Sequence, residues 1–420
     1  MSDQKYIFAL LAAAPPPGVK LDPADPRTWW MSTAEQEPNR FPVAAQMHDH
    51  CMRLAGVSAR KFYYDPMVNV KVGAAVAAYY GIDSPLAIPD VYNYEAEAMG
   101  QKMIYGEDSM PTIDFREPLV SEPKDLSKLK APEWLEKPRI RYILDLTKFN
   151  LEMGVISGMF CAPFSLAVGV RSYPKLIRDM KRDKPFAHDL FTKLVDDVLP
   201  SYLKVMKDYT GVTVATGADA WAAFPNLSPD LMEEWVVPYS LKLTQNCAKF
   251  GFTASAVASG DYCEERIERF DKQILFKCFD VQVALLGGAP VILLGMGRWQ
   301  DYPIEAVAEY LRPYKEKGVK ATVSAAINAR LLRDGPVEKI VDNVKRFVDL
   351  LGRDHTVLIF LASIPADTPP EHVHAAVAAA HAYSQLPIAD DLDKIEVKIP
   401  KRESFKEFVQ KTSQGAGLGV

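Results

Sequence analysis

The sequence predicts an α/β protein built as a (β/α)8 (TIM) barrel, with an N-terminal extension and a short C-terminal tail. From residue 41 onward, apolar runs of strand length alternate with longer amphipathic stretches, giving about eight strand–helix units in series. At 420 residues, the chain is also long enough for one large barrel. An open, doubly wound parallel sheet shows the same alternation and is the alternative fold.

The expected strands are short apolar runs, each followed by a helical pattern. They are Phe41–Met47, Pro85–Pro89, Gly154–Phe160, Val212–Gly217, Phe252–Ser259, Ile274–Phe279, Val319–Val323 and Thr356–Leu361. Three of the helices between them have proline start signals, and two of these end at glycine. These helices are Pro303–Lys317, Pro336–Leu351 and a helix that opens at Ser228-Pro229 and runs to about Phe250.

The clearest helix start follows the last expected strand, in the segment Ile364–Val373 (IPADTPPEHV). Thr368 is a favourable N-cap residue, and Pro369 suits the first helical position, where its missing N–H costs nothing. Glu371, three residues after the cap, can complete a capping box. We therefore expect a rigid turn from strand to helix and a helix over 369–383.

Composition divides the chain into three parts. Residues 1–40 form a proline-rich arm that we expect to pack on the barrel, residues 41–390 form the barrel, and residues 391–420 form a charged tail. The net charge of −5 gives no electrostatic reason to expect a nucleic-acid partner, and no run of 18 apolar residues predicts a membrane span. The five cysteines are scattered without CxxC spacing, which favours reduced thiols and a cytoplasmic location.

Catalytic residues of such barrels lie at the C-terminal ends of the strands, so we searched the residues that follow each expected strand. His48 and His50 follow the first strand and would lie on one side of it, as a metal-binding or substrate-binding pair. Alternatively, one histidine caps the next helix and the other faces solvent. Asp90 follows the second strand and can orient a substrate or move a proton, or it can serve as an N-cap.

Later strand ends add further polar and aromatic side chains. From the whole set we expect four catalytic residues, His48, Asp90, Glu95 and Asp219. We expect six residues to bind substrate, namely His50, Tyr92, Trp221, Ser259, Asp261 and Asn328. The sequence does not assign metal ligands, and it contains no GxGxxG fingerprint, Walker A motif or GxSxG elbow.

Several short stretches, in the same order along residues 41–385, resemble the uroporphyrinogen decarboxylase-like superfamily. They are Met52–Gly56 (MRLAG), Ile88–Gly100, Cys161–Ala167 (CAPFSLA), Leu227–Asp230 (LSPD), Leu331–Gly335 and the turn Ile364–Val373. The resemblance is strongest to the corrinoid-dependent methyltransferases of O-demethylase systems. It implies the same barrel fold.

Departures from the family patterns separate its branches. The decarboxylases hold substrate carboxylates with two arginines; Arg53 matches the first, but Val57 replaces the second. Their late histidine is also missing, which argues against porphyrinogen decarboxylation, although Asp90 matches the acid that would bind the pyrroles. The zinc enzymes that methylate thiols need a His-x-Cys-Gly and a later Cys, where this chain has Val257–Gly260 (VASG) and Ala362–Ile364 (ASI).

The resemblance therefore implies a methyltransferase that moves a methyl group from a small methylated donor, such as a methyl ether, to the Co(I) corrinoid of a separate corrinoid protein. The expected cofactor is that partner's corrinoid (cobalamin), since the chain has no DxHxxG motif; zinc is possible, but its usual Cys and His ligands are absent. The expected partners are the corrinoid protein and the small substrate, and a homodimer stays open. Trp221, Phe224, Tyr92 and Tyr94 would suit an aromatic ether.

Three other functions remain as alternatives. The first is a decarboxylase of the uroporphyrinogen type. The second is a metal-dependent hydrolase that uses the His48/His50 pair. The third is a barrel that only docks a corrinoid protein and has no chemistry of its own.

Overall fold

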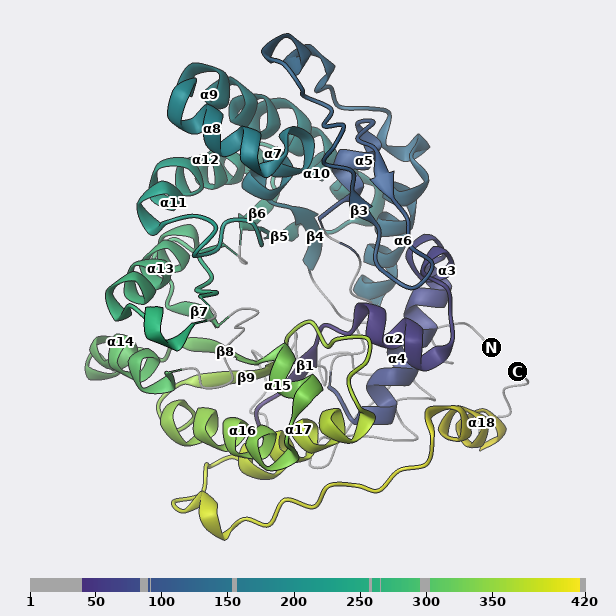
Figure 1. Ribbon diagram of the computed structural model, residues 1–420, viewed down its shortest axis with the longest axis vertical. Helices are drawn as coiled ribbons and strands as arrows, with labels where there is room; N and C mark the ends of the chain where they lie inside the picture. Colours follow the sequence, from purple (N-terminus) through teal and green to yellow (C-terminus); the bar gives the residue numbers. More distant parts are fainter. Residues whose placement is uncertain are drawn as a thin grey trace.

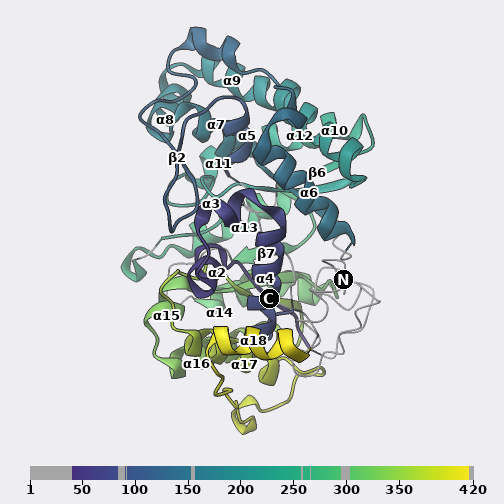
Figure 2. The ribbon, with the colours of Figure 1, turned by 90° about the vertical axis from the view of Figure 1, so that its right-hand side faces the viewer.

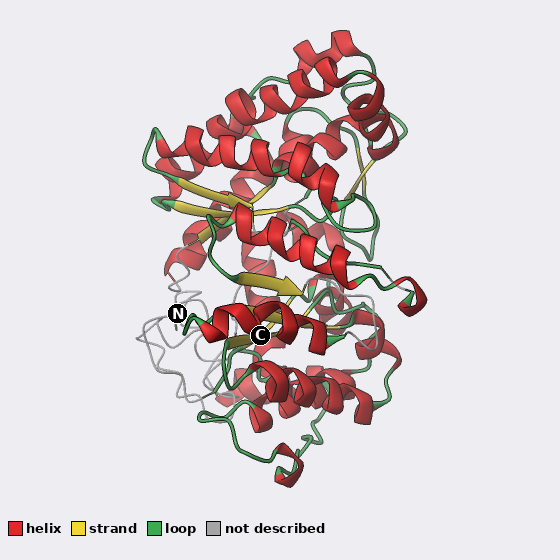
Figure 3. Ribbon diagram, turned by 90° about the vertical axis from the view of Figure 1, so that its left-hand side faces the viewer, coloured by secondary structure: helices red, strands yellow, loops and turns green. Residues whose placement is uncertain are grey.

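The computed structural model describes residues 40–83, 90, 92–152, 157–256, 259–264, 266–294 and 303–415. In this part of the chain, parallel strands lie inside and helices surround them (Figures 1 and 3). Each inner strand is followed by at least one helix, and the order along the chain is the order around the ring. This arrangement confirms the predicted α/β barrel.

The strands are short. They are β1 (Val43–Ala45), β2 (Met103–Ile104), β3 (Thr112–Ile113), β4 (Ser157–Cys161), β5 (Val214–Ala218), β6 (Thr253–Ala256), β7 (Val291–Leu294), β8 (Thr322–Ile327) and β9 (Thr356–Leu361).

The helices of the first half of the described chain are α2 (His48–Ala55), α3 (Ala59–Tyr64), α4 (Pro66–Tyr80), α5 (Tyr94–Ala98), α6 (Pro138–Glu152), α7 (Pro163–Arg171), α8 (Tyr173–Arg182), α9 (Lys184–Lys193) and α10 (Leu199–Thr210). Those of the second half are α11 (Pro229–Trp235), α12 (Val237–Ala248), α13 (Lys272–Leu285), α14 (Ile304–Glu316), α15 (Ala329–Asp334), α16 (Val337–Leu351), α17 (Pro370–Tyr383) and α18 (Phe405–Gly415). A π-helical turn, Leu194–Val198, joins α9 to α10, and short 3-10 turns span Pro123–Lys128, Trp134–Glu136, Ile267–Arg269 and Leu392–Lys394.

The inner strands pair in two parallel arcs, β4-β5-β6 and β7-β8-β9-β1. The pairing of β1 with β9 joins the first strand to the last, with Val43 opposite Ile359, as a closed barrel requires. A separate antiparallel hairpin, β2–β3, lies outside these arcs. The carboxyl ends of the inner strands therefore meet on one face of the molecule.

A side chain connects the two arcs where no backbone pairing joins β6 to β7 in the described chain. The amide of Gln282, on α13, accepts a hydrogen bond from the N–H of Leu293 (2.8 Å) and donates to the carbonyl oxygens of Leu293 (2.9 Å) and Gly260 (3.2 Å). Gln282 thus satisfies the edge of β7 as a neighbouring strand would. It is 2% exposed, so these bonds are shielded from water.

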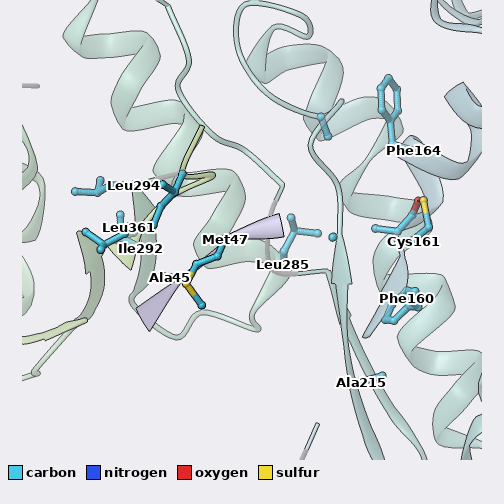
Figure 4. Close-up of a cluster of buried hydrophobic side chains, with 14 of the residues drawn as sticks. Ala45, Met47, Phe160, Cys161, Phe164, Ala215, Leu285, Ile292, Leu294 and Leu361 are labelled. Atoms are coloured by element: carbon cyan, nitrogen blue, oxygen red, sulfur yellow. The ribbon is translucent and has the colours of Figure 1, made fainter. Parts of the chain in front are cut away.

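Apolar side chains from both arcs fill the interior. Figure 4 shows Ala45, Met47, Ile292, Leu294 and Leu361 from the arc of β7, β8, β9 and β1, and Phe160, Cys161, Phe164 and Ala215 from the other arc and its helices. Gly217 has to be glycine, because a Cβ there would lie 2.7 Å from the ring of Phe160. The core therefore fixes the spacing of β4 and β5, whose ends carry part of the candidate site.

Most of the expected strands are confirmed, with small shifts at their ends, but one is wrong. Ile274–Phe279 lies within α13, and the strand of that unit is β7, Val291–Leu294. A short apolar run can be a strand or the buried side of a helix, and periodicity does not separate the two. The expected strand Pro85–Pro89 lies outside the described residues, except for its continuation at Asp90.

The expected helices are confirmed as α14, α16 and the pair α11–α12, but the capping box at the last helix is wrong. That helix, α17, begins at Pro370 with Pro369 at the N-cap. Thr368 is buried, and its Oγ1 has no hydrogen-bond partner among the described residues. Two successive prolines leave no backbone N–H at the first positions for the threonine to cap.

The C-terminal segment leaves α17, runs along the outside of the barrel and ends in α18, which packs against α4 and α2 (Figures 1 and 2). Within the described chain, no helix combines the length and the apolar character needed to cross a bilayer.

We expect Gln282→Leu to lower the free energy of unfolding by about 1–3 kcal/mol, because it leaves the N–H and the carbonyl oxygen of Leu293 buried and unpaired. Urea denaturation measures the change. The matched control is Gln273→Leu, on the exposed side of the same helix, which should stay within about 0.5 kcal/mol of the wild type. Equal losses in both variants would show that Gln282 does not connect the arcs.

Candidate active site

Glu95 is a fully buried carboxyl group in the first turn of α5. Its Oε1 accepts a 2.8 Å hydrogen bond from the N–H of Cys161, at the end of β4, and its Oε2 has no partner among the described residues. Burial raises the pKa of Glu95 to about 8, and the negative charge of Asp90 acts in the same direction. Glu95 is therefore mainly protonated at neutral pH and can donate a proton.

Asp90 is buried and lies in an ion pair with Arg139 of α6, with 2.9 Å between Asp90 Oδ2 and Arg139 Nη2. The same guanidinium group binds Glu97 of α5 at 2.9 Å through Nη1. The side-chain amide nitrogen of Asn93 lies 2.8 Å from both oxygens of Asp90. Asp90 is thus held by an arginine and an amide, and it does not act as the N-cap of α5.

Asp219 follows β5 and is also fully buried. Its Oδ1 accepts hydrogen bonds of 2.7 Å from the N–H and the Oγ of Ser165, and its Oδ2 accepts one of 3.2 Å from Ser259 Oγ. Burial raises the pKa of Asp219 to about 6, although these hydrogen bonds oppose the rise. The carboxyl group links the ends of β5, α7 and the segment that follows β6.

Tyr92 and Cys161 lie close enough to several of these acids for the carboxylate charges to change their pKa values. Burial raises the pKa of the Tyr92 phenol, and the charges of Asp261, Asp219 and Asp90 add to the rise. Burial likewise raises the pKa of the Cys161 thiol well above its usual value, and Glu95, Asp219 and Asp90 contribute. Both groups therefore stay protonated at neutral pH, so Cys161 is not a thiolate nucleophile.

His48 lies close enough to Asp90 to feel its charge. Burial lowers the pKa of His48 to about 4, and Asp90 opposes this change, so the imidazole is neutral at pH 7. His48 has a positive φ of 23°, and Ser363, at the end of the neighbouring strand β9, has a φ of 47°. Gln46 bonds Leu361, Ser363 and Ile364, which fixes both unusual turns at the same edge of the barrel.

The expected pairing of His48 with His50 is wrong. β1 ends at Ala45 and a helix begins at His48, so residues two apart point about 200° from each other instead of to one side. His50 contacts α4 instead, where its Nε2 is 2.7 Å from the hydroxyl of Tyr80. The expectation that His50 binds substrate therefore has no geometric support.

The remaining expected residues lie around this centre or at its rim. Trp221 is half-buried, and its indole stacks on Tyr173 with ring centres 5.2 Å apart, while Phe115 meets it edge-on. Asp261 lies in the segment after β6, where its charge acts on Tyr92. Asn328 follows β8 and caps α15, since its Oδ1 accepts the N–H of Leu331 at 2.9 Å.

The aromatic side chains expected to line a substrate pocket do not all do so. Tyr94 is fully buried in the core, and its hydroxyl donates to the carbonyl oxygen of Met159 at 2.7 Å. Phe224 stacks on Tyr262 with ring centres 5.0 Å apart. Only Tyr92 and Trp221, of the four, remain as candidates for contact with a ligand.

The described residues do not fit a zinc ion. They contain no group of three or more His, Cys, Asp and Glu side chains placed to bind a metal. Asp90 is occupied by Arg139, Asp219 by two serines, and His48 has no second imidazole beside it. The sequence also lacks the thiol ligands of the zinc branch, and the groups that the described part of the site offers are proton donors.

A cavity of about 960 Å³ opens beside α2 and the turn after β9. Arg53 and Arg60 both contribute to its wall, together with Glu107, Asp108 and the backbone around Gly56. Arg53 is the residue that matches the first substrate arginine of the decarboxylases. Val57 replaces the second of these arginines, but Arg60, three residues further along the chain, brings a second cation to the same cavity.

The sequence analysis assigned no chemical role to four residues of the site: Asn93, Arg139, Cys161 and Ser165. Cys161 and Ser165 belong to the stretch CAPFSLA that carries the family resemblance, so their position was visible but their role was not. Arg139 lies within the first turn of a helix, 49 residues after Asp90, and nothing in its neighbourhood marks it.

We expect Arg139→Met to lower the free energy of unfolding at pH 7 by about 3–5 kcal/mol, because it leaves Asp90 buried without its cation. Chemical denaturation measures this loss. Arg141→Met, two residues along on the solvent side of α6, should cost less than about 1 kcal/mol. Adding Asp90→Asn should restore part of the stability; an unimproved double variant would refute the ion-pair explanation.

We expect the stability of the wild type, relative to Glu95→Gln, to fall as the pH rises from 5 to 8. Unfolded Glu95 releases its proton near the ordinary pKa of 4.5, whereas the folded protein holds it up to about pH 8. The difference in slope should approach about 1.4 kcal/mol per pH unit. Urea denaturation at four pH values measures it, with exposed Glu136→Gln as the control; parallel curves would contradict the raised pKa.

Comparison with known proteins identifies the family of the chain. The family model described as "Uroporphyrinogen decarboxylase (URO-D)" matches residues 31–383. Uroporphyrinogen decarboxylase of Myxococcus xanthus (strain DK1622) is 30% identical over 194 residues, which is 44% of this chain and about half (53%) of that relative. A methyltransferase from Methanosarcina mazei has a similar structure, with a TM-score of 0.60 and 18% identity over 84% of this chain and 98% of that one. The chain therefore belongs to the uroporphyrinogen decarboxylase family and has its TIM-barrel fold.

Proposed function

We propose that the protein is a methyltransferase that moves a methyl group from a small methyl ether to the cobalt(I) corrinoid of a separate corrinoid protein. Family membership and the barrel shared with a methyltransferase support the general kind of enzyme. The observation that carries the proposal is Glu95, a buried carboxylic acid that keeps its proton at neutral pH and has one oxygen without a partner in the described chain.

Methyl transfer from an ether needs a proton donor more than it needs a base. The C–O bond breaks and its electron pair stays on oxygen, while cobalt(I) supplies the pair for the new bond to carbon. The leaving oxygen is strongly basic unless it takes up a proton as the bond breaks. Glu95 supplies this proton and regains one from solvent after the product leaves, which balances the reaction.

The neighbours of Glu95 support this role. The charge of Asp90 raises the pKa of Glu95, and Arg139 compensates that charge through its ion pair with Asp90. The phenol of Tyr92 is a further donor for the ether oxygen. Neutral His48, which is close enough to Asp90 to feel its charge, can accept a hydrogen bond from a hydroxyl group of the substrate.

The half-buried aromatic pair at the rim suits the aromatic class of donors. Trp221 and Tyr173 present stacked rings, with Phe115 across their edge. Phe115 is 38% exposed, so this group faces the outside of the described chain. A flat apolar group gains stacking energy there, on the order of 1 kcal/mol per ring pair.

The proposal is tested with the purified protein, a reduced corrinoid protein and a panel of methyl ethers, following the cobalt spectrum. We expect Glu95→Gln to slow methyl transfer by roughly 10²–10⁴-fold, because the amide cannot give up a proton. The wild-type rate should fall above about pH 8, where Glu95 ionises, and the variant should lose this dependence.

Glu136→Gln, at an exposed position, is the matched control and should transfer methyl groups at the wild-type rate. A spectrum that does not change with any donor would refute methyl transfer. A full rate in Glu95→Gln would refute the role of Glu95 alone.

Decarboxylation of a polycarboxylate is the second candidate function, and the cavity with Arg53 and Arg60 favours it. Two guanidinium groups at one wall can bind two carboxylates, even though Val57 replaces the expected second arginine. Incubation with uroporphyrinogen, followed by chromatography of the products, separates the two functions. Arg53→Gln and Arg60→Gln should abolish decarboxylation if it occurs, and unconsumed substrate removes this candidate.

A further inference from the structure

A second cavity with polar groups is lined by α17 and by none of the residues of the candidate active site. It has a volume of about 320 Å³ and lies between the end of α4, one face of α17 and the C-terminal segment. Figures 1 and 2 show this segment passing along the outside of the barrel from α17 to α18. Small-molecule sites commonly begin at about this volume, and an engineered cavity of about 150 Å³ already takes up benzene.

The wall formed by the C-terminal segment is anchored to the barrel. The hydroxyl of Tyr79, on α4, donates to the carbonyl oxygen of Glu403 at 2.9 Å. The rings of Phe405 and Phe408 pack on Tyr79, each with ring centres 5.4 Å apart. The cavity is therefore built by a fixed segment and not by a free tail.

Two histidines of α17 supply ring nitrogens that no described residue satisfies. His374 is 4% exposed, and neither of its ring nitrogens has a hydrogen-bond partner among the described residues. His381 is 5% exposed and its Nε2 is also without a described partner. His381 has a hydrogen bond with the backbone of Gly81, which makes Nε2 the nitrogen that accepts.

The wall opposite the histidines is positively charged. Arg402 has no ion pair in the described chain, whereas Lys398 lies 3.7 Å from Glu396. Arg40 lies near His381 but is neutralised by Asp83, at 2.5 Å. Tyr80 also lines the cavity, and its hydroxyl is occupied by His50. Arg402, whose guanidinium group lies 5.9 Å from the centre of the Phe408 ring, is therefore the cation of this wall without an ion pair among the described residues, and it favours an anion.

The spacing of the two histidines favours a ligand with a polar group at each end. They are seven residues apart and so lie on one face of α17, about 10 Å apart along its axis. A single small ligand can therefore reach both imidazoles with two polar groups that an apolar body separates. Val377, Ala378, Ala382 and Pro400 give the cavity an apolar surface for this body.

We propose that this cavity binds a small hydroxycarboxylic acid with an apolar body, such as a benzene ring. The carboxylate accepts from Arg402 and from the N–H of His374, and the hydroxyl group donates to Nε2 of His381. Inorganic phosphate does not fit, because it has no apolar surface to cover the alanine and valine side chains.

The test uses the full-length protein and isothermal titration calorimetry at pH 7 with three matched probes: 4-hydroxybenzoate, benzoate and 4-hydroxybenzamide. We expect 4-hydroxybenzoate to bind at least about tenfold more tightly than benzoate, which lacks the hydroxyl group, and than the uncharged amide. Equal affinity for the acid and the amide, or no heat from any probe up to 10 mM (about the weak limit for a specific site), overturns the proposal and leaves a cavity filled by water.

Arg402→Gln should weaken 4-hydroxybenzoate binding by about tenfold. Lys394→Gln, on the same segment but outside the cavity, is the matched control and should not change it. His381→Leu should abolish the preference for 4-hydroxybenzoate over benzoate, and its melting temperature shows whether it folds. Unchanged affinity in Arg402→Gln overturns the proposed orientation and the anion class with it.

Discussion

The ion pair of Arg139 with Asp90 and Glu97 is the interaction on which the candidate site depends. A buried carboxylate is costly unless a cation compensates it, and Arg139 compensates two at once, joining α5, α6 and the end of the second strand unit. While Arg139 compensates Asp90, the charge of Asp90 still raises the pKa of Glu95. It also opposes the lowering of the pKa of His48 by burial. Burial remains the main cause of both shifted pKa values, and Arg139 itself acts to lower the pKa of Glu95.

Much of the fold was predictable because a barrel repeats one pattern. β9 matched its expected bounds, Thr356–Leu361, and the helices that begin at proline began within one residue of expectation. The failures share a cause. Ile274–Phe279 and the His48–His50 stretch are short segments whose local pattern fits both a strand and a helix, and the tertiary context decided for the helix in both. Thr368 failed because two prolines follow it.

The candidate site was predictable only where the chemistry lies directly after a strand. Asp90, Tyr92, Glu95 and Asp219 were found by that rule and come together with Ser259 and Asp261 around the ends of β4, β5 and β6. Arg139 could not be found in this way, since a charged residue in a helix is ordinarily solvated and its burial depends on packing between helices far apart in sequence. The contact of His50 could not be predicted either, because it also depends on packing between helices. Only the structure shows that Tyr80 of α4 lies beside its imidazole.

The absence of zinc ligands and the raised pKa of Glu95 are consistent with each other. Zinc in a thiol methyltransferase lowers the pKa of its substrate and removes a proton from sulfur, so it suits an acceptor that must become an anion. An ether has the opposite need, because its oxygen must gain a proton as the methyl group leaves. Glu95, a buried carboxylic acid on α5 beside the end of β4, meets that need in a site where the described residues form no cluster of metal ligands.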